Sequence, residues 1–184
     1  MKIKGFLRRF RTFLKLCFIR LTHYKSFKFG YSCNFYSKVD FRFAKGKIRL
    51  GKKIGIRKNC EFSVNDGAIS IGDDCFFNRD CLIVSHEEIS IGNNCKFGPR
   101  VMMFDHDYDY KNEDKSKRCK YKTSPIYIGD NCWIGAGTII LRGPSIGDNC
   151  TIGAGSILKG IIPKNSIVIQ KREQKFIEVG RSKE

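Results

Sequence analysis

Acidic residues are almost absent from the first third of this 184-residue chain. Residues 1–60 contain 18 lysines and arginines but a single acid, Asp40, whereas residues 61–184 contain 17 basic and 17 acidic residues. The first third therefore supplies the formal net charge of +17. No nucleic-acid recognition motif accompanies this basic segment and the rest of the chain is balanced, so no nucleic-acid partner is expected. The charge placement instead favours contact between the N-terminus and an anionic surface or polymer.

Long apolar runs are also absent from the N-terminus. The apolar residues there fall on one stripe of a helix: Ile3, Phe6, Leu7, Phe10, Phe13, Leu14, Cys17 and Leu21. Basic residues interrupt the stripe before it could span a bilayer, and no apolar region precedes a small-residue cleavage site, so a secretory signal is not expected. We predict a basic amphipathic helix over residues 1–28. It caps the open end of a repeat or contacts another subunit, it lies on an anionic membrane, or it does both.

Cysteine pairs with CxxC spacing are missing, although the chain contains nine cysteines. Histidine occurs only three times, as His23, His86 and His106. Structural zinc sites and redox-active dithiols are commonly built from closely spaced pairs of these residue types. We therefore expect no metal site and no redox role for the cysteines.

A strict six-residue repeat, in contrast, runs through residues 128–158. One apolar residue opens each unit: Ile128, Ile134, Ile140, Ile146, Ile152 and Leu158. Helices space apolar residues by three and four and strands by two, so neither explains this period. A short strict repeat is typical of a coil that stacks on itself, with a strand and a corner per unit and three units per triangular turn. We expect glycine or Asn-Gly chemistry to supply the backbone angles of the corners.

The same phase extends towards the N-terminus and accounts for most of the cysteines. Further inward-facing residues are expected at Leu50, Ile56, Phe62, Ile71, Phe77, Ile83, Ile91, Phe97 and Met103. Six cysteines then lie four residues after an inward residue, where small side chains face the core: Cys60, Cys75, Cys81, Cys95, Cys132 and Cys150. A free cysteine packs as a small apolar residue. We therefore predict buried, unpaired thiols and a reducing, cytosolic setting.

The longest interruption of the repeat comes after Met103. The next inward residue is Ile128, so residues 104–127 leave the coil as a polar and charged excursion with His106 near its start. Loops of this length on a regular scaffold are usually functional or disordered. We therefore look for the functional site at this excursion.

The chain resembles the hexapeptide-repeat acyltransferases, in particular the sugar and polysaccharide O-acetyltransferases related to maltose and galactoside acetyltransferase. The resemblance covers roughly residues 50–169. Its most specific parts are Gly98-Pro99, Asp105-His106-Asp107 and the segments IYIGDNCWIGAG and IGAGSILKGIIP. It implies an all-β fold, a left-handed parallel β-helix or triangular solenoid, here with an N-terminal amphipathic helix and an extended loop after Met103. We predict three segments: the helix 1–28, the β-helix domain 29–163 with its excursion 104–127, and a C-terminal strand and tail 164–184.

The resemblance also implies a homotrimer that binds acetyl-CoA, the acyl donor, between adjacent subunits without a metal. His106 resembles the catalytic base of the family. We predict acceptor-binding roles for Asn78, His86, Asp105 and Tyr108. We predict cofactor-binding roles for Trp133, Ala136, Ala154, Lys159, Lys171 and Arg172, of which the basic residues suit phosphate groups or are solvated surface charges. The chain departs from related enzymes at Tyr108, where a second histidine is usual, and at His86, where galactoside acetyltransferases have an acid.

The repeat phase makes a prediction of its own about the two histidines. His86 lies three residues after inward Ile83, and His106 lies three residues after inward Met103. Both positions fall on the same side of consecutive coils, which are about 5 Å apart. We therefore expect the two histidines to be vertical neighbours, so that His86 forms part of the acceptor pocket or tunes His106. Asp105 and Asp107 flank the base, where either one orients its second ring nitrogen or both are solvated.

The predicted function is acetyl-CoA-dependent O-acetylation of a saccharide hydroxyl in cell-surface polysaccharide biosynthesis. A neutral imidazole suits removal of a hydroxyl proton near pH 7. The enzyme would be cytoplasmic, with residues 1–28 in peripheral contact with the inner face of the membrane. The alternatives on the same fold are an N-acyltransferase of an amino sugar nucleotide and a serine acetyltransferase. A zinc-dependent γ-class carbonic anhydrase and a noncatalytic scaffold are less consistent with one loop histidine and no histidine cluster.

Overall fold

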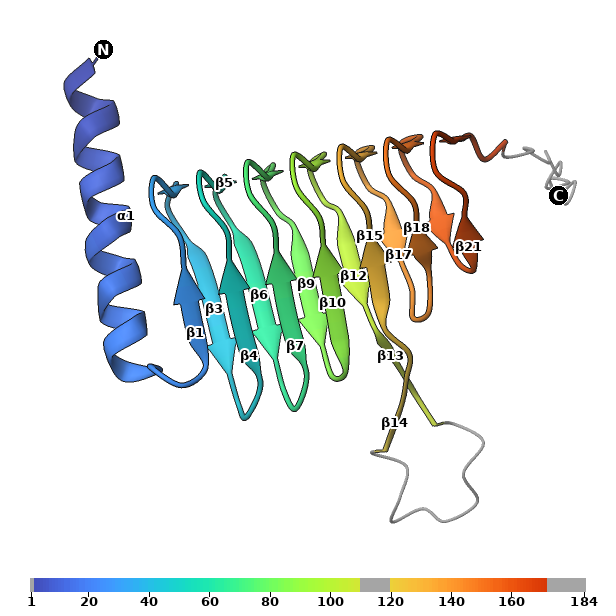
Figure 1. The fold of residues 1–184 in the computed structure, drawn as a ribbon, viewed down its shortest axis with the longest axis horizontal. Helices are drawn as coiled ribbons and strands as arrows, with labels where there is room; N and C mark the ends of the chain where they lie inside the picture. The colour runs from blue at the N-terminus through green and yellow to red at the C-terminus, as the bar shows by residue number, and fades with distance from the viewer. Residues whose placement is uncertain (1, 110–119, 172–184) are drawn as a thin grey trace, which may run out of the picture.

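The chain folds into one N-terminal helix followed by a parallel β-helix (Figure 1). The computed structural model describes residues 2–109 and 120–171. Helix α1 spans Lys2–Thr22 and lies across the N-terminal end of the coil. Within the described residues no helix is long and apolar enough to cross a membrane.

Three parallel sheets form the walls of the coil. Sheet A contains β1 (Phe27–Phe29), β4 (Lys47–Leu50), β7 (Ala68–Ile71), β10 (Glu88–Ile91), β15 (Ile126–Ile128), β18 (Ser145–Ile146) and β21 (Ile161–Ile162). Sheet B contains β2 (Asn34–Phe35), β5 (Gly55–Ile56), β8 (Phe76–Phe77), β11 (Lys96–Phe97), β16 (Trp133–Ile134), β19 (Thr151–Ile152) and β22 (Ile167–Val168). Sheet C contains β3 (Val39–Phe43), β6 (Cys60–Val64), β9 (Leu82–Ser85), β12 (Met102–Phe104), β17 (Ile139–Ile140) and β20 (Ile157–Leu158).

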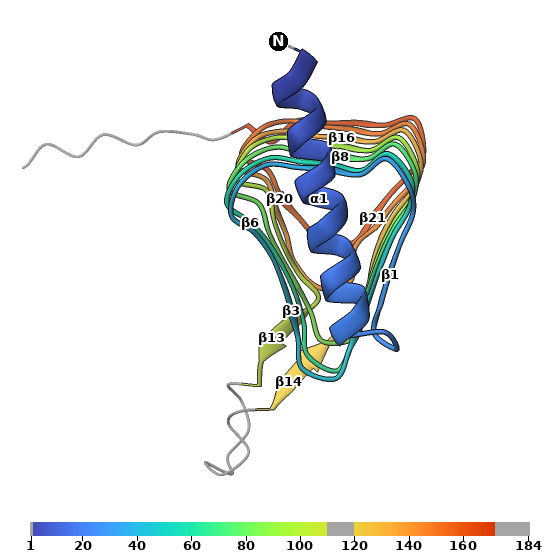
Figure 2. The ribbon, with the colours of Figure 1, turned by 90° about the vertical axis from the view of Figure 1, so that its left-hand side faces the viewer.

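The coil is left-handed. Figure 2 looks along it from the N-terminal end, where the chain passes from sheet A on the right, over the top through sheet B, to sheet C on the left. A path that turns anticlockwise as it recedes from the viewer is a left-handed one. The predicted left-handed parallel β-helix is therefore confirmed.

The six-residue phase predicts the core correctly. Ile83 pairs with Met103 and then Ile140 in sheet C, and every inward residue named from the sequence is buried. Because each strand lies directly over the one before it, like side chains stack: the rings of Phe77 and Phe97 are 4.4 Å apart and nearly parallel. Regular stacking of apolar side chains removes them from water along the whole coil.

The cysteines are packing residues, as predicted. All six on the repeat phase are buried, and none of the cysteines in the described part of the chain forms a disulfide. Their thiols contact carbonyl groups of the next coil, as when Cys75 Sγ lies 3.1 Å from the Gly92 carbonyl and Cys95 Sγ lies 3.1 Å from the Gly129 carbonyl. A small polarisable side chain thus fills each corner and also satisfies a backbone acceptor.

The corners between sheets A and B show which residues supply the turn angles. Positive φ angles belong there to Asn131 and Asn149, not to the glycines that follow the inward residues. The amides of these asparagines form a ladder, with Asn131 Nδ2 donating to Asn149 Oδ1 at 3.0 Å. Gly129 is needed for another reason, because a Cβ there would lie 2.3 Å from Asp148 Oδ1 and 2.8 Å from the Asp148 backbone nitrogen. Asparagine tolerates the left-handed conformation, and glycine permits the coils to stack closely.

The ends of the predicted segments need correction. The helix ends at Thr22 instead of residue 28, because Phe27–Phe29 pairs with β4 as the first strand of the coil. At the other end, Ile167–Val168 does not leave the repeat, since it pairs with β19 in sheet B. The coil is therefore longer at both ends than the repeat pattern indicated.

Helix α1 caps the coil through a narrow side that mixes polar and apolar residues. Leu16 and Thr12 are buried against the first coil, and Thr12 Oγ1 accepts a hydrogen bond from the Phe35 backbone N–H at 2.9 Å. Lys15 Nζ donates to the Val39 carbonyl, which also belongs to the first coil. Strands at the end of a coil leave backbone groups unpaired, so polar side chains of a covering helix can satisfy them. The capping role is confirmed, but the predicted apolar stripe faces away from the coil.

Candidate active site

The long excursion begins as a β-hairpin that projects from the edge between sheets C and A (Figures 1 and 2). Strand β13 (His106–Tyr108) pairs antiparallel with β14 (Tyr121–Thr123). Residues 110–119 of the predicted loop lie outside the described residues. Two ion pairs hold the hairpin: Arg142 Nε donates to Asp107 Oδ2 at 2.6 Å, and Lys122 Nζ lies 2.8 Å from Asp109 Oδ1. The base of the excursion is therefore an ordered strand pair, which places His106 at the fourth coil.

His86 and His106 are neighbours on consecutive coils, as the repeat phase predicts. Their ring centroids are 3.9 Å apart. Tyr121, which returns on β14, lies 4.1 Å from the ring of His86 and 5.1 Å from that of His106. Tyr108 is exposed and packs on Tyr121 at 5.0 Å. The site is thus a cluster of two imidazoles and two phenols on one corner of the coil.

Asp105 lies beneath this cluster and is completely buried, with 0% of its surface exposed. Its Oδ1 accepts the His86 backbone N–H at 2.8 Å and lies 3.3 Å from His106 Nδ1. Its Oδ2 accepts the Ser85 hydroxyl at 2.8 Å and the Glu87 backbone N–H at 2.9 Å. A buried carboxylate is retained at low cost only when donors surround it in this way. The prediction that Asp105 contacts the acceptor is therefore wrong, and the alternative that it orients His106 agrees with the structure.

The tautomer of His106 follows from this arrangement. A carboxylate can only accept a hydrogen bond, so Nδ1 facing Asp105 carries the proton when the ring is neutral. The lone pair is then on Nε2, the nitrogen that serves as a base. The His106 side chain retains 13% of its exposure. His106 therefore has both a fixed orientation and access to solvent, which are what a general base needs.

His86 is positioned by a second contact. Its Nε2 lies 2.6 Å from Asn65 Nδ2, one coil nearer the N-terminus. Partial burial and the neighbouring His106 lower the pKa of His86 below its usual range. Because the amide of Asn65 donates to Nε2, the neutral ring is favoured there. His86 is thus a half-buried imidazole whose neutral form is favoured, and it flanks His106 directly.

The remaining predicted acceptor residue lies elsewhere. Asn78 is at the corner between sheets B and C, where its Oδ1 accepts the Arg79 backbone N–H at 2.9 Å. The histidine cluster occupies the corner between sheets C and A. Within one chain the structure does not bring Asn78 to His106, because two different edges of the triangular coil separate them.

The predicted cofactor residues fall into two groups. Trp133 lies on the outer face of β16 with 58% of its surface exposed, and Ala136 and Ala154 follow at stacked corners between sheets B and C. Lys159 is exposed at the corner after β20, two coils beyond His106 along the same edge. Lys171 is exposed at the end of the described chain, and Arg172 lies outside the described residues. Trp133 and the alanines therefore share an edge that the histidine cluster does not.

Sequence reasoning missed Ser85, Tyr121 and the burial of Asp105. A signal for the aspartate was present, because inward and outward positions alternate along a strand. Counting by two from inward Met103 places Asp105 inside and His106 outside. Tyr121 left no such signal, since the path by which the excursion returns is absent from the repeat phase.

Within residues 2–109 and 120–171, no group of three or more His, Cys, Asp or Glu side chains lies close enough to hold a metal ion.

The chain combines a six-residue repeat with a left-handed β-helix. A family model described as the hexapeptide repeat of succinyl-transferase matches residues 125–160. The resemblance to the hexapeptide-repeat acyltransferases is thereby confirmed. Proteins similar to this chain in sequence and in structure carry acyltransferase names.

Three relatives illustrate the match. The galactoside O-acetyltransferase of Lactococcus lactis is 35% identical over 118 residues, which cover 61% of this chain and 56% of that protein. A hexapeptide-repeat acetyltransferase from Vibrio cholerae is similar in structure, with a TM-score of 0.57, 26% identity, and coverage of 64% of this chain and 66% of the other. The N-acyltransferase AntD from Bacillus cereus has a TM-score of 0.67 at 18% identity and covers 80% and 81%, a likeness of fold. The chain spans about half the length of the first curated relatives that it matches.

Proposed function

We propose that this protein is an acetyl-CoA-dependent O-acetyltransferase whose acceptor is a saccharide hydroxyl. The observation that carries the proposal is the pair formed by buried Asp105 and His106 at the outer edge of the coil. The names of the similar proteins support acyl transfer as the reaction class. The surrounding aromatic rings support a saccharide acceptor, since sugars stack on such faces.

His106 acts as the general base. Its Nε2 removes the proton of the acceptor hydroxyl as that oxygen attacks, and a base in this role typically contributes about 10²–10⁴-fold in rate. Asp105 stabilises the imidazolium that forms and keeps the ring in place. His106 then returns the proton to the departing sulfur. Acetyl-CoA supplies the activated acetyl group as a thioester.

The edge that contains Trp133, Ala136 and Ala154 fits the acyl donor. A Cβ added at Gly135 would lie 2.5 Å from the Ala154 backbone nitrogen, so the corners there stack backbone on backbone with small side chains. A smooth edge of this kind admits an extended pantetheine arm, and exposed Trp133 offers an apolar face beside it. Lys159 lies on the edge of the histidine cluster, so it would neutralise phosphate charge on a donor held by the neighbouring subunit.

A homotrimer would complete the site. Trp133 and His106 lie on different edges of one chain, so a donor bound along the first edge reaches His106 only across a subunit boundary. Packing three coils side by side brings the edge of one subunit against the other edge of its neighbour, and closed symmetry is the usual form of such assemblies. Asn78 would then approach the acceptor from the neighbouring subunit. We place this enzyme in the cytoplasm, acting on a precursor of a cell-surface glycan.

Substitution of the base tests the proposal. His106→Ala should reduce acetyl transfer to a saccharide by about 10²–10⁴-fold, because the imidazole removes the hydroxyl proton. Acetyl-CoA binding, measured by calorimetry, should be unchanged, and His23→Ala serves as the matched control. Transfer by His106→Ala at the wild-type rate would contradict the role. Transfer to amino sugars but not to hydroxyl acceptors would favour the N-acyltransferase alternative.

A further inference from the structure

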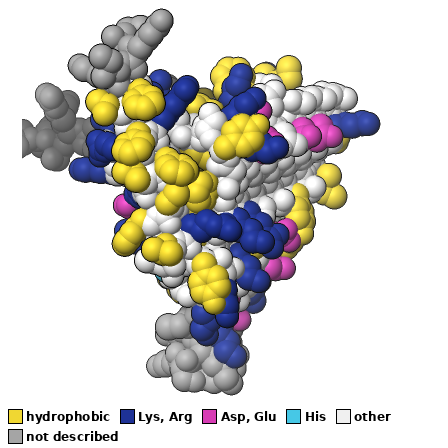
Figure 3. Space-filling model, turned by 60° about the vertical axis from the view of Figure 1, so that its left-hand side comes forward, with side chains coloured by type: hydrophobic (Ala, Val, Ile, Leu, Met, Phe, Trp, Pro, Cys, Tyr) yellow, Lys and Arg dark blue, Asp and Glu magenta, His cyan; other side chains and the backbone are white. Residues whose placement is uncertain are grey.

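The outward face of α1 is apolar and exposed. Seven large apolar side chains on it are more than half exposed: Phe6, Leu7, Phe10, Phe13, Leu14, Phe18 and Leu21. In Figure 3 hydrophobic side chains gather on the side of the molecule that carries the helix, with Lys and Arg side chains beside them. Contiguous apolar patches of this kind mark contact with a partner or a membrane. We call these seven residues the α1 outer face.

The helix does not need this face to hold the coil. Its inner side already packs through Leu16 and Thr12. Arg8 also points inward, donating from Nε to Asn34 Oδ1 at 2.8 Å and stacking on Tyr36. The α1 outer face is therefore not needed for capping and remains available to bind a partner.

The charges around the face indicate what that occupant is. Exposed Arg9, Arg11 and Arg20 flank the apolar residues, and no acidic residue occurs before Asp40 in the sequence. Asp40 is itself engaged by Lys15 at 3.9 Å. A partner that is apolar in its interior and negatively charged at its surface complements such a helix. An anionic phospholipid bilayer has both properties.

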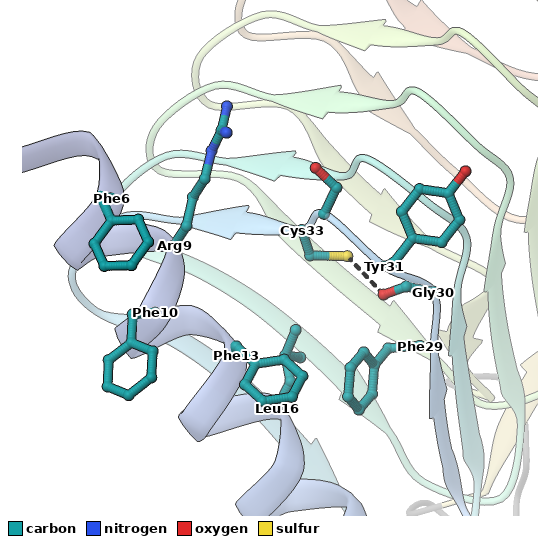
Figure 4. Close-up of a pocket in the computed structure, with 10 residues that line it drawn as sticks. Phe6, Arg9, Phe10, Phe13, Leu16, Phe29, Gly30, Tyr31 and Cys33 are labelled. Atoms are coloured by element: carbon teal, nitrogen blue, oxygen red, sulfur yellow. Dashed lines mark hydrogen bonds between the residues drawn. The ribbon is translucent and has the colours of Figure 1, made fainter. Parts of the chain in front are cut away.

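A groove beside the helix enlarges the same apolar surface. It has a volume of about 600 Å³ and lies between α1 and the first coil. Figure 4 shows Phe10, Phe13 and Leu16 of the helix facing Phe29 across it, with Arg9 above the apolar side chains. Apolar walls below a guanidinium group suit an acyl chain below a phosphate headgroup.

We infer that α1 docks this protein on an anionic phospholipid membrane, with the α1 outer face inserted at the level between headgroups and acyl chains. Because the helix lies across the end of the coil, the coil then projects away from the membrane (Figure 1). His106 follows the fourth coil, three steps of about 4.8 Å above the first. With a helix about 10 Å across below them, the histidines stand about 25 Å from the membrane surface. Combined with the proposed function, on which this step rests, that height suits a saccharide acceptor attached to a lipid.

Co-sedimentation of the full chain with vesicles tests the inference. Wild-type protein should bind vesicles of phosphatidylcholine mixed with phosphatidylglycerol, and binding should weaken with added salt or with phosphatidylcholine alone. The triple variant Phe6→Gln, Phe10→Gln, Phe13→Gln should lose about tenfold or more of this binding, since it removes inserted apolar area. Glutamine retains helix propensity, and circular dichroism checks that the fold is kept.

A matched control removes apolar area elsewhere. Ile161, Ile167 and Ile169 are even more exposed at the opposite end of the coil, so the variant with glutamine at all three should bind vesicles as the wild type does. His106→Ala should also bind normally, which separates a failure of docking from a failure of the proposed reaction. Equal binding by the Phe6, Phe10, Phe13 variant and the wild type would overturn the inference. So would a change in its oligomeric state without lipid, which would make the face a contact between copies.

Discussion

Two columns of stacked side chains in the coil differ in their chemistry. In the interior column, Phe77 lies on Phe97 with ring centroids 4.4 Å apart and both side chains buried. At the corner between sheets C and A, His86 lies on His106 at 3.9 Å, above a buried carboxylate. The same regular spacing therefore serves two purposes. In the core it removes apolar surface from water, and at the corner it brings titratable groups from distant parts of the chain together.

The largest effect should follow from breaking the interior column. Phe97→Ala removes a fully buried ring in contact with Phe77 and should lower the free energy of unfolding by about 3–5 kcal/mol. Urea denaturation monitored by circular dichroism measures this change. Lys96→Ala on the exposed side of the same strand is the control and should stay within about 0.5 kcal/mol of the wild type. A loss as small as that of the control would show that the stacked core tolerates cavities.

Breaking the corner column should affect both stability and function. Asp105→Asn replaces one acceptor oxygen with an NH₂ group, which faces either the His86 N–H or the donors of Ser85 and Glu87. An unsatisfied buried donor should cost about 1–3 kcal/mol of stability. Transfer should also fall, because the imidazolium of His106 loses its counter-charge.

Asp107→Asn provides the comparison for that change. Asp107 is exposed and pairs only with Arg142 among the described contacts, so its stability loss should be about 0–1 kcal/mol. Urea denaturation together with initial rates under saturating acetyl-CoA measures both variants. An equal loss of transfer activity in Asp105→Asn and Asp107→Asn would contradict the orienting role of Asp105.

The smallest effect concerns the second histidine. The pKa of His86 is lowered by partial burial and by His106, so the folded state binds a proton there less readily than the unfolded chain does. The stability linked to this group is present above the unfolded pKa of about 6.5 and is lost as pH falls through the folded pKa. His86→Gln removes this linkage, so its melting temperature should fall less than that of the wild type between neutral and mildly acid pH. A steeper fall of the melting temperature in His86→Gln would show that folding raises the pKa of His86.

Much of the fold was determined by the sequence alone, because each coil repeats one local pattern. A period of six with three units per turn determines which residues face inward, which explains the buried cysteines and the pairing of Ile83 with Met103. The vertical stacking of His86 on His106 follows from the same periodicity. These features depend only on counting along a regular coil, so no knowledge of distant contacts was needed.

Tertiary structure decided the rest. Tyr121 joins the histidines because the excursion folds back as a hairpin, and the repeat contains no information about that return. The sequence also did not show which face of α1 contacts the coil. Amphipathicity shows that a helix has two faces but not which one packs. The first coil presents unpaired backbone groups such as those of Phe35, which Thr12 satisfies, and an apolar end on which Leu16 and Ile19 pack. Hydrogen bonding and packing at the open end of the coil therefore determined which face of the helix was left exposed.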